Sequence, residues 1–207
     1  MKSLATYPRI AGINYESMND GNGMRAVIYV SGCPHHCPQC HNPESHDPAY
    51  GEELTPDLLT TIRKEIADRP FLQGLTLSGG EPFFQPQATF NLLNLLNLSA
   101  LRSKDEPPLN LWIYTGYTWE ELMGVLSSNH PEREAVFQLL NHTDCLVEGR
   151  FEIAKRDITL AHRGSSNQRI IAAKISLNGS QSCAEALTDL PPVDLSMDYD
   201  AVKNGGK

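Results

Sequence analysis

Three cysteines lie within eight positions of the sequence, at a spacing that could bind a metal centre. Cys33, Cys37 and Cys40 form the pattern C-x-x-x-C-x-x-C, and no fourth cysteine follows nearby. Thiolates are soft ligands that favour zinc, copper(I) or iron–sulfur clusters. Closed structural metal sites take four protein ligands as a rule. A 4Fe–4S cluster held by three cysteines would leave one iron open to a substrate or cofactor, which is the arrangement that catalysis needs.

A zinc site of the Cys3His type is the alternative that the spacing leaves open. Its fourth ligand would be one of the histidines in or beside the cysteine loop, namely His35, His36, His41 or His46. In that case the chain would be a zinc-stabilised interaction domain without catalytic activity.

Composition and charge exclude several other classes of protein. The chain of 207 residues is 40% hydrophobic and 20% charged, as expected of a globular protein. The net charge is −8 and no Lys/Arg cluster is present, so a nucleic-acid partner is not expected. No apolar run reaches the roughly 18 residues that a membrane span requires, and the N-terminus lacks a signal peptide. We therefore expect a cytoplasmic protein, in which clustered cysteines bind metal.

Short β-rich runs alternate with helical patterns along most of the chain. Strands are predicted at residues 25–30, 74–78, 111–115, 144–149 and 168–175. Helices are predicted at residues 55–69, 87–101 and 131–142, the first with Thr55 as N-cap and Pro56 at its first position. This alternation predicts an α/β fold of parallel strands and crossover helices, either open or curled into a partial barrel.

The predicted domain covers residues 1–175. Residues 176–207 carry Pro and Gly without periodicity, and we expect them to form a C-terminal extension that is disordered or lies over the domain. Cys183 in this extension is interpreted as a bystander, and Cys145 as a buried residue of a strand.

Unusual polar or glycine-rich stretches follow four of the predicted strands. In chain order they are "SGCPHHCPQC", "GGEP", "TGY" and "GRF". Parallel strands place their carboxyl ends at the same edge of a sheet, which is where sites form in α/β proteins. The sequence therefore predicts one site at which the four stretches meet.

The cysteine loop resembles the signature of the radical S-adenosylmethionine (SAM) enzymes, and "SGGEP" at residues 78–82 resembles a second motif of those enzymes. The resemblance is closest to the activators of anaerobic ribonucleotide reductase, a branch of the glycyl-radical activases. It runs in the order of that family over roughly residues 6–170 and is carried further by "DGNGMR" (20–25), "IYTGY" (113–117), "DCLVEGRF" (144–151) and "RGSSNQR" (163–169).

The resemblance implies an open, partial β/α barrel that holds a 4Fe–4S cluster on Cys33, Cys37 and Cys40. It also implies a SAM site, to which the matching positions contribute Gln39, Cys40, His41, Gly79, Gly80 and Glu81. The glycines would let the main chain approach the methionine end of the cofactor, and Glu81 could accept from its ammonium group. No acid–base side chain is expected, because the key step moves a hydrogen atom.

The implied reaction begins with an external one-electron donor, a flavodoxin- or thioredoxin-type system, which reduces the cluster. Reductive cleavage of SAM then gives a 5′-deoxyadenosyl radical. This radical generates a glycyl radical on the large subunit of the anaerobic ribonucleoside-triphosphate reductase. An activase for another glycyl-radical enzyme, of the pyruvate formate-lyase type, is the alternative.

Some positions depart from the family pattern or keep several interpretations. Asn22 stands where proline is more frequent, and Gln39 where an aromatic residue is frequent. His35 and His36 are expected to face solvent. The roles of Arg150, Arg163 and Arg169 remain open between surface ion pairs, cofactor contact and partner docking.

Overall fold

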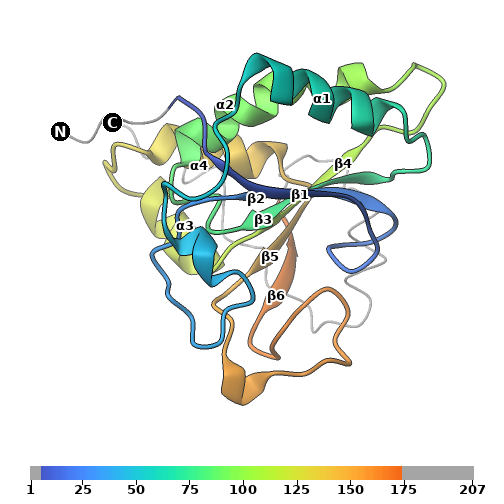
Figure 1. Cartoon of the computed structure of the whole chain (residues 1–207). Coiled ribbons are helices and arrows are strands. Elements are labelled where there is room, and N and C mark those ends of the chain that lie inside the picture. The colour runs from blue at the N-terminus through green and yellow to red at the C-terminus, as the bar shows by residue number, and fades with distance from the viewer. Residues whose placement is uncertain (1–5, 174–207) are drawn as a thin grey trace.

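A computed structural model describes residues 6–173 of the chain (Figure 1). The strands are β1 (Ile10–Ser17), β2 (Arg25–Val30), β3 (Gly74–Gly79), β4 (Asn110–Tyr114), β5 (Cys145–Glu148) and β6 (Arg169–Ala172). The α-helices are α1 (Pro56–Ala67), α2 (Pro86–Leu96), α3 (Trp119–Leu126) and α4 (Arg133–His142). The predicted α/β class and all five predicted strands are confirmed. The extension at 176–207, with Cys183, lies outside the described residues.

The six strands form one sheet whose spatial order follows the chain, from β1 to β6. Strands β2 to β5 are parallel, as predicted. The two edge strands are antiparallel to their neighbours, so the prediction of a wholly parallel sheet is wrong. Residues 149–168 contain only a three-residue 3-10 helix and not the crossover helix that a parallel connection requires, which is why β6 runs back along β5. The sheet is open, with β1 and β6 as its edges.

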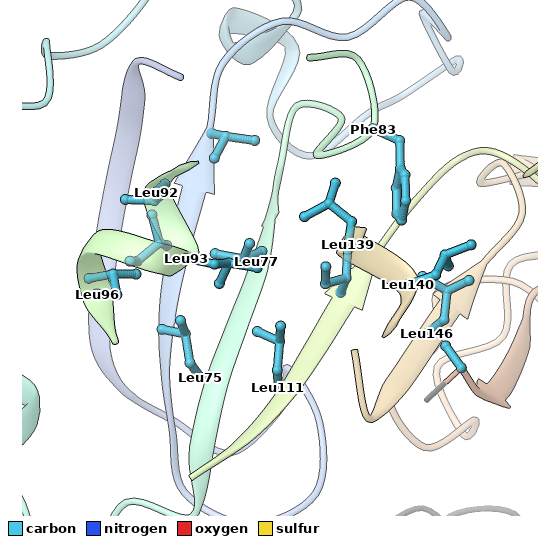
Figure 2. Packing of buried hydrophobic residues seen from close by; sticks show 14 of the residues in the cluster. Leu75, Leu77, Phe83, Leu92, Leu93, Leu96, Leu111, Leu139, Leu140 and Leu146 are labelled. Atoms are coloured by element: carbon cyan, nitrogen blue, oxygen red, sulfur yellow. The ribbon is translucent and has the colours of Figure 1, made fainter. Parts of the chain in front are cut away.

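The hydrophobic core lies between the helices and one face of the sheet. Alternate side chains of the strands point toward the helices, as the two-residue period of a strand dictates. Helix α2 packs against α1 and α4, and α4 packs against α3, so the helices form one continuous layer. Figure 2 shows the leucines of α2 and α4 packed over those of β3 and β4. The segment predicted as a helix at residues 87–101 contributes Leu92, Leu93, Leu96 and Leu101 to this core.

The opposite face of the sheet is more polar and contains a fully buried arginine. Arg25 donates to Thr76 Oγ1 at 2.8 Å, to the Leu75 carbonyl at 2.7 Å and to Asn110 Oδ1 at 2.7 Å. Its guanidinium also lies 5.3 Å from the ring centroid of Trp112. Burial lowers the pKa of Arg25 to about 10, so the side chain remains charged at neutral pH. It therefore ties together the amino ends of β2, β3 and β4.

Capping groups set the starts of two helices. Thr55 Oγ1 accepts from Leu58 N at 3.1 Å, which confirms the predicted N-cap of α1. Helix α3 was not predicted, although Thr118 and Glu121 form a reciprocal capping box at its start. No helix in the described part of the chain is long and apolar enough to cross a membrane.

Candidate metal centre and cofactor cavity

The carboxyl ends of β2, β3, β4 and β5 meet around a cavity of about 220 Å³, which confirms the predicted convergence. Each strand end contributes a short loop to the wall. The lining residues include Cys33, His35, Cys37, Cys40 and His41 after β2, Gly79 and Gly80 at β3, Thr115 and Gly116 after β4, and Gly149 and Phe151 after β5.

The three cysteines of the loop are free thiols, half-buried, and all of them line this cavity. Burial raises the pKa of the Cys33 thiol to about 11 and also raises the pKa of Cys37. Metal ions that bind here must therefore displace protons. Among the described residues, no three His, Cys, Asp or Glu side chains converge closely enough to hold a single metal ion. The thiols instead stand around the cavity.

The glycines at the end of β3 have no room for a side chain. Gly79 has φ +97°, in the left-handed region that favours glycine. A Cβ on Gly80 would lie 2.7 to 2.9 Å from the carbonyl oxygens of Gly32, Ser45 and Val30. The main chain of this strand end therefore passes directly along the cavity wall, where a ligand can contact it.

Glu81 follows these glycines but does not line the cavity, because its carboxylate is buried behind the wall. Its Oε1 accepts from Phe83 N at 2.9 Å and from Thr115 Oγ1 at 2.8 Å. Its Oε2 accepts from Gly116 N at 2.7 Å and lies 2.7 Å from His35 Nε2. The expectation that His35 faces solvent is wrong, since its side chain is only 5% exposed.

The other loop residues with predicted roles differ in their placement. His41 lines the cavity, with its ring centroid 6.1 Å from that of Phe151. Gln39 is exposed, with φ +57°, and does not line the cavity. His36 is exposed, and its Nδ1 lies 3.3 Å from Nδ1 of His46.

The connection between β5 and β6 closes one side of the cavity with residues for which no site role was predicted. Phe151, Gly164 and Gln168 all line it. The Gln168 side chain donates to the Gly149 carbonyl at 3.0 Å and accepts from Gly164 N at 2.8 Å. The "GRF" and "RGSSNQR" motifs therefore meet across this connection. In the sequence, only the resemblance to the family indicated that these two motifs belong to the site.

A second cavity of about 570 Å³ adjoins the first and shares His41, Tyr114, Phe151 and Gly164 with it. Arg163 lines this second cavity and donates to the Gln168 carbonyl at 3.3 Å. The space beside the cysteine loop therefore extends past these shared residues into the second cavity.

Arg150 and Arg169 are engaged in ion pairs with acidic side chains. Arg150 pairs with Glu121 at 3.0 Å. Arg169 pairs with Glu120 at 2.7 Å and also with the buried Glu148. These pairs fasten the ends of the β5–β6 connection to the start of α3, next to the cavity.

Replacing Arg169 with methionine is expected to destabilise the fold by about 2 kcal/mol near pH 7.5, because the buried carboxylate of Glu148 loses its cationic partner and keeps a main-chain donor, Trp119 N. Burial already raises the pKa of Glu148 in spite of Arg169, and loss of the arginine raises it further. A raised carboxyl pKa means that the native state binds protons more tightly than the unfolded state. The deficit should therefore shrink as the pH falls to 5 and Glu148 becomes protonated.

Urea unfolding of the wild type and of Arg169→Met at pH 7.5 and pH 5 measures this effect. Arg150→Met is the control, since its partner Glu121 is 42% exposed and the pair should contribute less than about 1 kcal/mol. Equal deficits for Arg169→Met at both pH values would contradict the assignment to Glu148.

The donor set around the first cavity fits an iron–sulfur cluster. Three free thiols surround one space, and thiolates are the ligands that such clusters take. The side-chain-free strand end beside them fits a small polar ligand that contacts the main chain.

Comparison with known proteins agrees with this chemistry. A family model described as "4Fe-4S single cluster domain" matches residues 19–171, a span that includes the whole cavity. The anaerobic ribonucleoside-triphosphate reductase-activating protein of Pasteurella multocida is 36% identical over 152 residues, which are 73% of this chain and 89% of that protein. The protein of the same name from Escherichia coli K12 is 33% identical over 150 residues, 72% of this chain and 88% of the relative. The one from phage T4 is 28% identical over 151 residues, 73% and 85% of the two chains. The chain therefore belongs to the family of anaerobic ribonucleoside-triphosphate reductase-activating proteins.

Proposed function

We propose that this chain is a radical SAM enzyme that activates an anaerobic ribonucleoside-triphosphate reductase by generating a glycyl radical on its large subunit. The six-stranded sheet would be the open, partial β/α barrel of such enzymes. The observation that carries the proposal is the shared cavity, in which three free thiols face a strand end of two glycines. The names of the relatives support the choice of partner.

Within this proposal, Cys33, Cys37 and Cys40 would hold a 4Fe–4S cluster through their thiolates, and SAM would supply the remaining ligation. The main chain at Gly79 and Gly80 receives the methionine end of the cofactor. Cys40 and His41 form the neighbouring wall. Gln39 and Glu81 do not line the cavity, so we assign them no direct contact with the cofactor.

A cluster held there would supply the one-electron reducing power for cleavage of SAM to methionine and a 5′-deoxyadenosyl radical, which is the chemistry needed to remove a hydrogen atom from a glycine Cα of the reductase. The residues of this chain bind, orient and shield the reactants. Phe151 and Tyr114 stand at the boundary between the two cavities, where they limit the access of water. The electron comes from an external donor, a flavodoxin- or thioredoxin-type system.

The test is to reconstitute the protein anaerobically with iron and sulfide, reduce it, and record electron paramagnetic resonance spectra with and without SAM. We expect a reduced cluster whose signal changes when SAM is added, followed by a glycyl-radical signal on the reductase. One zinc per chain without iron or sulfide would instead identify a zinc-stabilised interaction domain. A radical that forms only on an enzyme of the pyruvate formate-lyase type would contradict the choice of partner.

A further inference from the structure

A buried hydrogen bond joins His35 of the cysteine loop to Glu81. His35 lines the cavity, and Glu81 lies behind the cavity wall. His35 lies between two of the cysteines, and its Nε2 is 2.7 Å from Glu81 Oε2. The two side chains are 5% and 0% exposed, so water does not compete for this contact. A carboxylate can only accept, which makes His35 the donor.

The glutamate on the other end of this bond is held rigidly. Besides His35, it accepts from the main chain of Phe83 and Gly116 and from the hydroxyl of Thr115, at 2.7 to 2.9 Å. Three strand-end loops therefore meet at a single carboxylate. A charged acceptor in a buried position makes stronger hydrogen bonds than a neutral one.

Packing fixes the imidazole as well. Its ring stands edge-on to that of Tyr117, with 4.6 Å between the centroids. A Cβ added to Gly116 would lie 2.3 Å from the His35 ring, so the glycine leaves room for the histidine. The position of the ring is therefore set from two sides.

The start of the cysteine loop is anchored by its main chain, whereas the middle depends on a side chain. Gly32 N and Cys33 N donate to carbonyls of the connection that follows the loop, and the Gly32 carbonyl accepts from Glu81 N at 2.8 Å. Further along the loop, the His35 side chain supplies the hydrogen bond to the ends of β3 and β4. This bond therefore helps to hold the segment that carries the second and third cysteines, together with the main-chain hydrogen bond from Phe151 to Cys37.

We infer that His35 is a positioning residue that, through Glu81, fixes the cysteine loop relative to the glycine strand end. This inference rests on the proposed function, because the distance it sets is the one between the cluster and the methionine end of SAM. Glu81 thereby acts through its buried carboxylate on the geometry of the site, without contact to the cofactor.

The test compares His35→Ala, His35→Gln and His36→Ala as anaerobically reconstituted proteins. Glutamine can place an N–H donor near the position of Nε2, whereas alanine cannot. We expect His35→Ala to bind SAM about tenfold more weakly in a spectroscopic titration, equivalent to about 1.4 kcal/mol. Its iron content should stay near that of the wild type, because all three thiols remain. His35→Gln should recover to within about threefold of the wild type.

His36→Ala is the matched control, because His36 is an exposed histidine of the same loop and does not line the cavity. It should bind SAM as the wild type does. If His35→Ala matches this control, the inference is overturned. It is also overturned if His35→Gln is as weak as His35→Ala, because the contact with Tyr117 and not the hydrogen bond would then position the loop.

Hydrogen exchange on the metal-free proteins tests the same link without a cluster. The amide of Cys40, which donates to the Cys37 carbonyl within the loop, should exchange at least about tenfold faster in His35→Ala than in His36→Ala, while the amides of β2 to β4 keep their protection. Unchanged exchange in the loop would overturn the inference, even if the variant cannot be reconstituted. A wild-type cluster whose spectrum does not change when SAM is added would overturn the proposed function. The hydrogen-exchange result would then decide the role of His35.

Discussion

Replacing Cys37 with alanine is expected to give a folded protein that cannot retain its iron–sulfur cluster. The thiol lines the cavity at the end of β2 and lies outside the hydrophobic core, so truncation should cost less than about 1 kcal/mol in stability. In the proposed site, the loss of one of the three thiolates would leave one iron without its protein ligand. Activation of the reductase should fall more than about 100-fold. This loss exceeds the roughly 10- to 100-fold loss that is typical when a residue hydrogen-bonded to a metal ligand is replaced.

Iron and acid-labile sulfide per chain, measured after anaerobic reconstitution, check this result, with His36→Ala as the control on the same loop. Thermal unfolding of the metal-free proteins shows whether the variant is folded. A Cys37→Ala protein that keeps the iron content of the wild type would contradict ligation by the three cysteines.

Replacing Arg25 with methionine should destabilise the fold by about 4 kcal/mol, more than the loss of Arg169 does. The variant leaves the acceptors of Leu75 and Asn110 without their donor in a site from which water is excluded. It also loses the contact with Trp112. Because three strands share this arginine at their amino ends, the cost should appear as a global loss of stability.

Urea unfolding of the metal-free proteins measures this loss. Arg25→Lys should fall between the wild type and Arg25→Met, since an ammonium keeps the charge but not the planar fork of donors. Lys64→Met removes an exposed cation of α1, whose ion pair with Asp68 is exposed too, and should unfold close to the wild type. If Arg25→Met unfolds at the same urea concentration as Lys64→Met, the buried network does not stabilise the sheet.

The sequence allowed the central strands to be predicted because buried parallel strands are continuous apolar runs. "RAVIYV" at residues 25–30 coincides with β2 for this reason. Strand β1 was missed because it lies at an edge, where Asn14 and Glu16 are exposed and the apolar signal is weak. The direction of β6 was wrong because a strand pattern carries no direction. Only the absence of a helical pattern in residues 149–168 could have indicated that β6 runs antiparallel to β5.

The cysteines and glycines of the site could be identified from the sequence because their chemistry resides in residue type and short spacing. The role of His35 could not be predicted from the sequence, since its partner Glu81 is 46 residues away and no periodicity relates the two residues. Glu81 itself was expected at the cofactor because it adjoins the glycines. The structure places its carboxylate behind them, where it accepts from four donors.

The hydrogen bonds that join the strand ends have a consequence for the biogenesis of the protein. The carboxylate of Glu81 and the ion pairs of Arg169 bring the four loops together through contacts within the chain itself. Small zinc domains, by contrast, stay unfolded until metal arrives. These contacts involve no metal, so we expect the chain to fold before iron and sulfide are inserted and to stay folded when they are removed.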